Sequence, residues 1–418
     1  MTFRFVHTAD LHLDAPLKAM AFRDPELARE IGTASRTAFS RIVDLCIDEA
    51  VGFLLIAGDL WDGDYSSTKT PRFLKQELLR LHGAGIGCFV IRGNHDALAR
   101  QTGELDPPEN TTVFGGRAST SEIEIDGHRI AIHGLSFREA HAPESLLPRY
   151  PAPVPGAFNI GMLHTSLNGS PGHDNYAPCS AADLAAQGYD YWALGHIHRR
   201  TEYPGPPVVV MPGTPQGRDI GEAGECSVTL VTVGDDNATT LERRSVAPIR
   251  FDRLTLDCDA VTEWPDLLTL LETGIRGAAQ ATRPEDRLVI RPVLTGSTPL
   301  AWRLARDLDR LTEEARAFAT DAGIWIDKLE LGLLPAGPTQ YGAQLPQDLV
   351  DLVLNELPGD AGVRAAITAA AEELSRDLPP ELRDILGQNE ADMTGICLDL
   401  LARGTPVILS GLAEETAD

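Results

Sequence analysis

The sequence lacks the features that are typical of secreted, membrane-spanning and disulfide-stabilised proteins. Its first residues contain neither a basic stretch nor a long apolar run, so we expect no secretory signal. No run of about eighteen apolar residues occurs, so no membrane span is expected. The 6 cysteines are scattered without a Cys-x-x-Cys pair, which is typical of buried thiols in a reducing compartment and not of a zinc or iron–sulfur site. We therefore expect a cytoplasmic protein that does not engage a membrane.

Positive charge is also scarce. The chain carries 36 lysines and arginines against 61 acidic side chains, a net charge of −25. Residues 336–418 have the greatest excess of acidic over basic side chains, with 15 acidic and 4 basic. A surface that binds a phosphate polymer is normally basic, so the composition counts against a bare nucleic-acid-binding protein. Bound cations, or a partner subunit with a basic surface, would offset this acidity.

Length and pattern predict three parts. The 418 residues exceed one ordinary core, and a hydrophobic content of 43% permits a sizeable interior. We predict a catalytic domain at 1–248, a small α/β unit at 249–335 and an acidic, mostly helical region at 336–418, with 333–338 as a linker. The apolar stripe of the last region is more typical of a helix core than of a docking surface: Leu349, Leu352, Val353 and Leu357.

Three early strands alternate with two helices along the chain. Continuous apolar runs at 3–9, 53–57 and 86–91 predict buried strands, and apolar residues at helical spacing predict helices at 26–50 and 69–83. This order predicts a right-handed parallel α/β arrangement. Such sheets place their active sites at the carboxyl ends of the strands.

Later segments predict further strands and a small additional unit. Hairpins are expected around Asp126-Gly127 and between Cys226 and Ser245, with buried strands at 158–163 and 188–194 between them. With the early strands, they predict an α/β fold of two packed mixed β-sheets flanked by helices. The small unit is expected to contain three strands and two helices, at 250–256, 287–294, 325–331, 263–280 and 299–322.

Side chains that can bind metal ions follow five predicted strands: Asp10 and His12; Asp59; Asn94 and His95; His164; His196 and His198. In extended backbone the imidazoles of His196 and His198 would point to the same side, and Gly195 lets the backbone come close to a bound ion. Histidine and asparagine beside aspartate favour mid-series metals over magnesium or calcium. The set is large enough for two ions, with Asp59 as the candidate bridging carboxylate.

Such a site suits phosphoester hydrolysis. Two ions neutralise phosphoryl oxygens, activate water near neutral pH and stabilise the charge of the transition state. An uncoordinated histidine can protonate the leaving oxygen, and His95 fits that role because Asn94 beside it can bind metal while His95 faces the substrate. Asp96 either orients His95 or is the N-cap of the following helix, and the two interpretations stand equally.

Five short motifs resemble those of the calcineurin-like metallophosphoesterases: Asp10-Leu11-His12, Gly58-Asp59-Leu60-Trp61-Asp62, Gly93-Asn94-His95-Asp96, His164 and Gly195-His196-Ile197-His198. Three features narrow the resemblance to the bacterial SbcD/YhaO-type DNA-repair exonucleases, relatives of the meiotic-recombination nuclease of archaea and eukaryotes. They are the opening stretch 9–14, the loop 212–218 and the small α/β unit after the core. The motifs cover roughly residues 1–220, and 249–335 resembles that family's capping domain by position and pattern only.

The resemblance implies a four-layer sandwich that holds two divalent ions, most often Mn²⁺. One ion would be held by Asp10, His12, Asp59 and His198, and the other by Asp59, Asn94, His164 and His196, with His95 as the catalytic histidine. The implied activity is 3′-to-5′ cleavage of DNA, with possible endonuclease activity, in DNA repair. The implied assembly is a homodimer beside a coiled-coil ATPase of the SMC type, which would dock after the capping domain.

Two other functions stay open. A phosphoesterase for small substrates, such as cyclic nucleotides, would use the same metal chemistry, and the acidic composition favours it. The loop at 212–218 and the cap-like unit count against that alternative. A non-catalytic scaffold subunit would keep the site for structural reasons, but the complete ligand set counts against it.

The other histidines and the arginines are expected to lie outside the metal site. His7 and His133 fall inside predicted strands and are interpreted as core histidines, whereas His173 lies in a glycine-rich stretch that could flank the site. Five arginines could line a path for DNA, and the first and last are preferred because they adjoin motif loops: Arg92, Arg138, Arg199, Arg200 and Arg218.

Overall fold

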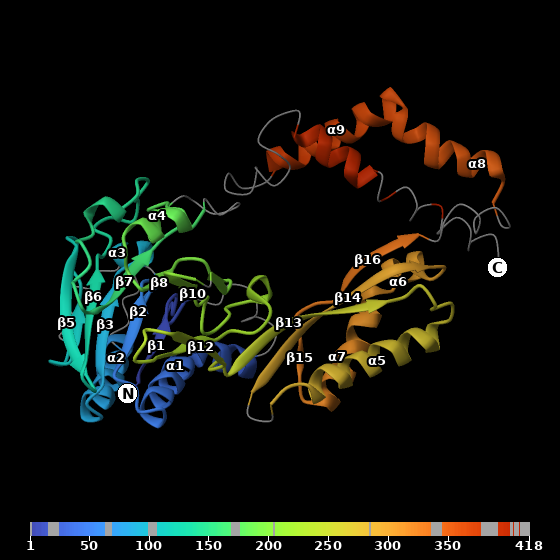
Figure 1. Cartoon of the computed structure of the whole chain (residues 1–418). Helices are drawn as coiled ribbons and strands as arrows, with labels where there is room; N and C mark the ends of the chain where they lie inside the picture. Colours follow the sequence, from blue (N-terminus) through green and yellow to red (C-terminus); the bar gives the residue numbers. More distant parts are fainter. Residues whose placement is uncertain are drawn as a thin grey trace. The chain divides into compact units, whose positions relative to one another are not determined.

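The computed structural model contains two compact units (Figure 1). It describes residues 2–15, 25–62, 69–98, 107–168, 176–203, 205–283, 286–335, 345–377, 392–401, 404 and 409. The first unit comprises Met1–Asp252 and Arg283–Val289, and the second comprises Arg253–Thr282 and Ile290–Asp418. The domain boundaries at 248 and 335 stay a prediction.

The first unit begins with a six-stranded mixed sheet in the order β12-β11-β1-β2-β3-β4. Strands β1 (Phe3–Thr8), β2 (Phe53–Ala57), β3 (Gly87–Ile91) and β4 (Thr111–Val113) are parallel, and the hairpin of β11 (Val228–Val233) and β12 (Thr239–Arg244) adds antiparallel to β1. Helices α1 (Pro25–Asp48) and α2 (Lys69–Gly83) connect β1, β2 and β3. The predicted alternation of strands and helices is confirmed. Both helices pack on one face of the sheet, as right-handed crossovers require.

The second sheet also has six strands, in the order β5-β6-β7-β8-β10-β9. A hairpin of β5 (Ser119–Ile125) and β6 (His128–Gly134) forms about Asp126-Gly127, as predicted. Parallel pairing continues through β7 (Phe158–His164), β8 (Tyr191–Gly195) and β10 (Val208–Met211), and β9 (Thr201–Tyr203) closes the edge antiparallel to β10. The sheet is therefore mixed, like the first.

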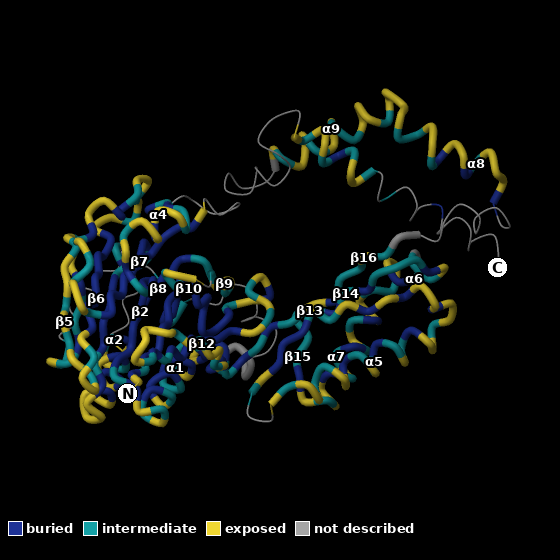
Figure 2. Tube along the Cα trace, viewed as in Figure 1, coloured by how far each residue is buried: buried dark blue, intermediate teal, exposed yellow. Residues whose placement is uncertain are grey.

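The hydrophobic residues of the central strands alternate between two cores. Phe53 and Leu55 pack between the sheets against Phe158 from the second sheet, whereas Leu54 and Ile56 pack against α1 and α2. This is the period of two expected of a strand buried on both faces. The short helix α4 (Ala181–Ala186) and neighbouring loops cover the outer face of the second sheet. The resulting four layers appear in Figure 2 as buried strands beneath partly exposed helices, and the predicted fold class is confirmed.

Before its C-terminal helices, the described part of the second unit contains a four-stranded sheet and three helices. Its elements are β13 (Ile249–Asp257), α5 (Trp264–Gln280), β14 (Arg287–Thr298), α6 (Ala301–Arg306), α7 (Leu308–Ala322), β15 (Trp325–Ile326) and β16 (Glu330–Pro335). Two details differ from the prediction. The helix expected at 299–322 is two helices that meet at Asp307. Leu333–Pro335 is not a linker but the end of β16, an edge strand that pairs with β14 and so tolerates its terminal proline.

The described part of the C-terminal region is helical. Helix α8 (Gln347–Asp351) runs into a π-helical turn at Leu352–Glu356 and a 3-10 turn at Leu357–Gly359, and α9 (Ala361–Asp377) follows. Val350 and Val353 are buried, whereas Leu352 is 42% exposed, so the predicted stripe is wrong at that position. The π-helical turn changes the angular spacing between successive side chains.

All six cysteines are buried free thiols. Among the residues that the structure describes, no helix combines the length and the apolar character needed to cross a membrane.

Candidate metal centre

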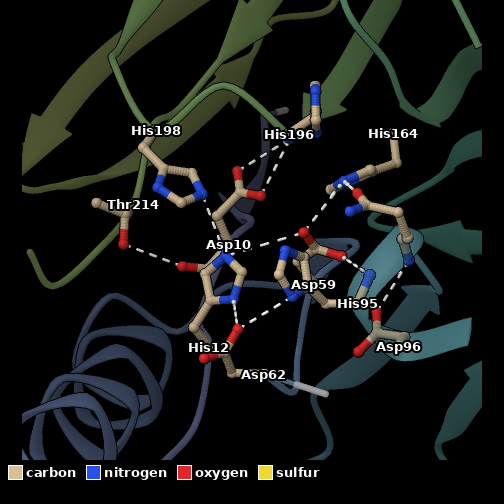
Figure 3. A network of polar contacts seen from close by, with 12 residues as sticks. Asp10, His12, Asp59, Asp62, His95, Asp96, His164, His196, His198 and Thr214 are labelled. Carbon is tan, nitrogen blue, oxygen red and sulfur yellow. Dashed lines mark hydrogen bonds and ion pairs between the residues drawn. The ribbon is translucent and has the colours of Figure 1, made fainter. Parts of the chain in front are cut away.

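The predicted ligands come together at the carboxyl ends of strands from both sheets. Three strands of the first sheet and two of the second end here, and Figure 3 shows their side chains converging. In chain order, the residues follow or end β1, β2, β3, β7 and β8: Asp10 and His12; Asp59; Asn94 and His95, in the short helix α3 (Asn94–Leu98); His164; His196 and His198. The fold therefore gathers these residues at the carboxyl ends of the strands, where parallel sheets place their active sites.

The chain turns sharply at four of these residues. The backbone angle φ is +53° at Asp10, +40° at His12, +52° at Asp59 and +106° at His196. Left-handed backbone costs roughly 1–2 kcal/mol for a residue with a Cβ atom, and such residues cluster at functional sites. The fold therefore holds four predicted ligands in conformations that their residue types do not favour.

Backbone hydrogen bonds between loops hold these turns. The loops after β1 and β2 run side by side: the N–H groups of Asp10 and His12 donate to the carbonyl oxygens of Gly58 and Asp59, at 3.0 Å each. The Thr214 hydroxyl donates to the Asp10 carbonyl oxygen at 3.0 Å. The loop at 212–218, singled out in the sequence, thus supports the turn that carries Asp10.

The stretch His196-Ile197-His198 is not extended, and the prediction that both imidazoles point to one side is wrong. β8 ends at Gly195, and the left-handed turn at His196 sends the two rings to different neighbours. His198 faces His12, with 3.1 Å between their Nε2 atoms. The His196 ring instead lies 5.2 Å from the His164 ring and 5.1 Å from the Tyr176 ring. His196 therefore stands beside the second predicted ligand set without joining a tight donor group.

One group of donor atoms consists of Asp10, His12 and His198, whose ligand atoms lie within 4.8 Å of one another. The Nδ1 atom of His198 is 2.6 Å from Oε1 of Glu222, where the ring N–H donates to the carboxylate. Burial raises the pKa of Glu222, but His198 and Arg218 outweigh it and hold that pKa at about 2. Glu222 is therefore ionised, and it orients His198 so that its Nε2 lone pair faces the group.

A second group consists of Asp10, Asp59 and His164, whose ligand atoms also lie within 4.8 Å of one another. The His164 ring donates from Nδ1 to the Ala57 carbonyl oxygen at 3.0 Å, which leaves the Nε2 lone pair for the group. That Nε2 atom lies 3.0 Å from Oδ1 of Asn94 and 3.4 Å from Oδ2 of Asp59. Burial lowers the pKa of His164, but the charge of Asp59 outweighs it and raises that pKa to about 9. A positive charge at this point is thus strongly favoured.

The donor chemistry of both groups fits divalent cations. In each group, lone pairs of oxygen and nitrogen atoms converge on a common point, which is repulsive unless a proton or a metal ion sits there. Asp59 faces both groups, since Oδ2 lies 3.8 Å from His12 Nε2 and 3.4 Å from His164 Nε2. A carboxylate shared in this way suits a pair of ions, and the mixture of nitrogen and oxygen donors suits mid-series metals.

His95 lies at the open edge of the centre. Its side chain is 39% exposed, whereas those of His12 and His164 are nearly or fully buried. Its Nδ1 atom lies 3.0 Å from Oδ1 of Asp62, and the same carboxylate oxygen is 3.4 Å from His12 Nδ1. These three residues form a third group close enough to hold an ion. The exposure of His95 instead suits a residue that meets substrate.

Asp96 does not take the place that the orienting role requires. Its carboxylate accepts backbone N–H groups, from Trp61 and Gly93 at 2.9 Å each. Burial raises the pKa of Asp96 to about 6. Asp96 is the third residue of α3, where its carboxylate accepts the Gly93 N–H, so the prediction that it is the N-cap of the following helix is wrong. The carboxylate beside His95 is that of Asp62.

Replacing Asp62 with asparagine should shift the pH dependence of catalysis. The hydrogen bond to Asp62 raises the pKa of His95. If protonated His95 is the active form, the rate falls as pH rises through that pKa. Asp62→Asn removes the charge and lowers the pKa of His95, so the alkaline limb should move to lower pH by about one unit. The measurement is kcat/KM against pH, with Asp44→Asn, a half-exposed carboxylate paired with Arg80 on the helical layer, as the control. An unmoved limb in Asp62→Asn would contradict this role.

Gly195 permits a close approach within the protein, and the approach of its backbone to a bound ion stays a prediction. A Cβ atom here would lie 2.1 Å from the Ala57 carbonyl oxygen and 2.9 Å from the Ala9 Cβ. Gly195→Ala should therefore push apart the ends of β1, β2 and β8 and lower the free energy of unfolding by about 1–3 kcal/mol or more. Denaturant unfolding measures this, and Gly83→Ala, where nothing lies within 4 Å, should be neutral or slightly stabilising. Equal midpoints for Gly195→Ala and the unmodified chain would refute the packing argument.

The remaining histidines behave as expected where the structure describes them. His7 is fully buried, with its two ring nitrogens 3.0 Å from the Tyr191 hydroxyl and 3.1 Å from the Leu194 carbonyl oxygen. His133 is also fully buried, between Thr120 and Asn159. His173 lies outside the described residues.

Two functional carboxylates escaped the sequence reasoning. Asp62 belongs to the motif that begins at Gly58, and its position three residues after Asp59 was an available signal. Glu222 had no such signal, because it lies beyond the loop at 212–218 and meets His198 only through tertiary folding.

Comparisons with known proteins agree with this geometry. The family model for calcineurin-like phosphoesterases matches residues 3–200. A second model, described as the middle domain of the metallophosphoesterase YhaO, matches residues 251–333.

Two relatives extend the comparison over most of the chain. The uncharacterized metallophosphoesterase YhaO of Bacillus subtilis (strain 168) is 33% identical over 312 residues, which cover 74% of this chain and 75% of that protein. The DNA double-strand break repair protein Mre11 of Methanopyrus kandleri is 23% identical over 419 residues, which cover 92% of this chain and 85% of that protein. With its donor groups at the strand ends of a two-sheet sandwich, the chain belongs to the calcineurin-like metallophosphoesterases, in the group that contains YhaO and Mre11.

Proposed function

We propose that the chain is a Mn²⁺-dependent nuclease that hydrolyses DNA phosphodiesters. The observation that carries the proposal is Asp59, a buried carboxylate of the second donor group whose Oδ2 also lies 3.8 Å from His12 of the first, with the exposed His95 beside it. The Mre11 relatives, named for DNA double-strand break repair, favour DNA as the substrate. By the same similarity we propose 3′-to-5′ exonuclease polarity with possible endonuclease activity, a role in DNA repair and a cytoplasmic location.

The roles of the residues follow from their positions. Asp10, His12, Asp59 and His198 would hold one ion, and Asp59, Asn94 and His164 the other, with His196 joining after its ring rotates. Two such ions would supply Lewis-acid stabilisation of the phosphoryl group and an activated water.

His95 would act on the leaving group. The Nδ1–H of His95 donates to Asp62, so its Nε2–H is the proton that the ring can give to the leaving 3′ or 5′ oxygen. Asp62 acts through His95 and is a positioning residue. It keeps the ring in one orientation and favours the protonated form that general-acid catalysis needs.

The assembly is also a proposal. By similarity to the SbcD/YhaO-type nucleases, an SMC-type coiled-coil ATPase would dock on the region 336–418, and two chains would form a homodimer. Deleting residues 340–418 should abolish co-purification of the ATPase and leave cleavage intact. Unchanged co-purification would contradict the docking site.

Cleavage assays on two substrates test the proposed function. The purified chain is given an end-labelled blunt DNA duplex and, separately, a chromogenic small phosphodiester, each with Mn²⁺, Mg²⁺ or EDTA. Mn²⁺-dependent shortening of DNA, absent from His95→Ala, is the expected result, and the label position gives the polarity. Hydrolysis of the small diester without any cleavage of DNA would overturn the nuclease proposal.

That second outcome corresponds to the alternative of a small-molecule phosphoesterase. The observation that favours it is the charge of the chain, −25, together with a site whose arginines are mostly paired with glutamates. The two substrates separate the alternatives because both depend on the same metal centre.

A further inference from the structure

A long cavity opens from the metal centre within the first unit. Its volume is about 1220 Å³, larger than the 300–1,000 Å³ of most small-molecule sites. Asp59, Asn94 and His95 line one part of it, and the rest is lined by Tyr176, the segment 196–202, Arg218, residues 221–223, residues 225–226 and Arg243. The cavity thus has room for more of a substrate than one phosphodiester group.

Four arginines line this cavity, and three of them are already paired. Arg200 donates to Glu202 at 2.8 Å and to the Thr229 hydroxyl at 2.7 Å. Arg218 pairs with Glu222 at 2.6 Å, and Arg243 pairs with Glu225 at 3.0 Å. Moving any of these guanidinium groups to a phosphate would leave a glutamate uncompensated beside a polyanion, which is unfavourable.

Arg199 is different from the other three. It is exposed, it lines the same cavity, and it directly follows the metal-ligand candidate His198. Within the described part of the chain, no carboxylate pairs with its guanidinium group. Arg199 is therefore the arginine of this cavity that can take an anionic ligand at no cost to an existing ion pair.

The backbone beneath Arg199 is held in place by the loop at 212–218. Gly213 has φ +76°, and a Cβ atom there would lie 2.6 Å from the His198 carbonyl oxygen and 2.9 Å from the Arg200 backbone nitrogen. The Thr214 N–H donates to that same His198 carbonyl at 3.0 Å. A fixed backbone lowers the entropy cost of placing the side chain on a ligand.

We propose that Arg199 binds a non-bridging oxygen of a DNA phosphate adjacent to the one being cleaved. The inference rests on the proposed nuclease function and names the residue that recognises the substrate as a strand. A guanidinium group suits this ligand because its planar donors match two phosphate oxygens. Arg92 and Arg218, the arginines preferred from the sequence, do not have this role: Arg218 is held by Glu222, and Arg92 is outside the residues that line the cavity.

Salt dependence of DNA binding tests the assignment. The cleavage-deficient His95→Ala chain is titrated with a fluorescent single-stranded oligonucleotide in Mn²⁺ at several salt concentrations. Adding Arg199→Ala should weaken binding by about tenfold to a hundredfold and reduce the slope of log K against log salt by about 0.7, the value for one phosphate contact on a single strand. Arg199→Lys should keep the slope and recover part of the affinity, because it keeps the charge but not the planar fork.

The control is Arg149→Ala in the same His95→Ala background. Arg149 is an exposed arginine at the end of a 3-10 helix (Leu147–Arg149) and is not among the residues that line the cavity, and its removal should leave the slope as it was. If the His95→Ala chain binds DNA and Arg199→Ala has the same slope and affinity, the assignment of Arg199 is overturned while the nuclease function stands. If the His95→Ala chain does not bind DNA and the unmodified chain hydrolyses only a small diester, the function and the assignment fall together.

Discussion

Replacing Asp59 with alanine should remove metal ions and catalysis together. Oδ2 of Asp59 faces His12 and His164, one from each donor group, so its loss weakens both positions at once. Metal ions supply several kcal/mol of transition-state stabilisation, and each 1.36 kcal/mol is a tenfold change in rate. We therefore expect cleavage to fall by about a thousandfold or more, with loss of tightly bound manganese.

Metal content after gel filtration in Mn²⁺ measures the first effect directly. Asp59 also accepts the His95 backbone N–H at 3.0 Å, so circular dichroism must show that the alanine variant folds. Asp59→Asn provides a second variant that keeps the shape of the side chain and removes its charge. Asp235→Asn, an exposed carboxylate in a hairpin turn, is the matched control. Retention of two ions by folded Asp59→Ala would contradict its bridging role.

Replacing His95 with alanine should separate catalysis from metal binding. General-acid catalysis contributes typically 10²–10⁴-fold, so cleavage should fall by about that factor while both ions stay bound. The physical reason is position: His95 is the most exposed histidine of the centre, and its Nδ1 is engaged by Asp62. Metal content and single-turnover cleavage on the same preparation give both quantities.

The leaving group provides an internal control for His95. A p-nitrophenolate leaves without protonation, so His95→Ala should lose much less activity on a nitrophenyl phosphodiester than on DNA. An equal loss on both substrates, together with loss of one ion, would show that His95 is a ligand. That result would assign an ion to the third donor group, which contains His12, Asp62 and His95.

The sequence predicted the positions of the ligands because those positions depend on local pattern. Apolar runs placed β1, β2 and β3, and the ends of parallel strands meet at one edge of a sheet. The residues that follow those strands, Asp10 and Asp59 among them, therefore had to gather there. Hairpin turns and crossover helices followed from the same local rules.

Contacts between distant segments could not be predicted in this way. Glu222 meets His198 from a loop that the strand pattern does not fix, and Asp62 reaches His95 because the loop after β2 turns sharply at Asp59. The left-handed turn at His196 likewise overrides the alternation expected of an extended strand. Each error arose where tertiary contacts hold the backbone against its local preference.

The same dependence on tertiary contacts explains why the sequence did not show which arginines are available to bind an anion. Position in the sequence ranked Arg92 and Arg218 above Arg199, because those two adjoin motif loops. Their availability depends on which glutamates fold against them, and Glu222 and Glu225 are brought to the cavity by segments outside the motifs. A net charge of −25 is therefore compatible with the availability of Arg199 beside the metal centre.

The most direct measurement is the anomalous diffraction of crystals grown with Mn²⁺, recorded near the manganese absorption edge. We expect two peaks about 3.5–4 Å apart, with Asp59 between them, Asp10, His12 and His198 on one side, and Asn94 and His164 on the other. His95 should be free of both ions and paired with Asp62. A single peak, or two peaks that do not share Asp59, would contradict the two-metal centre from which the proposed chemistry follows.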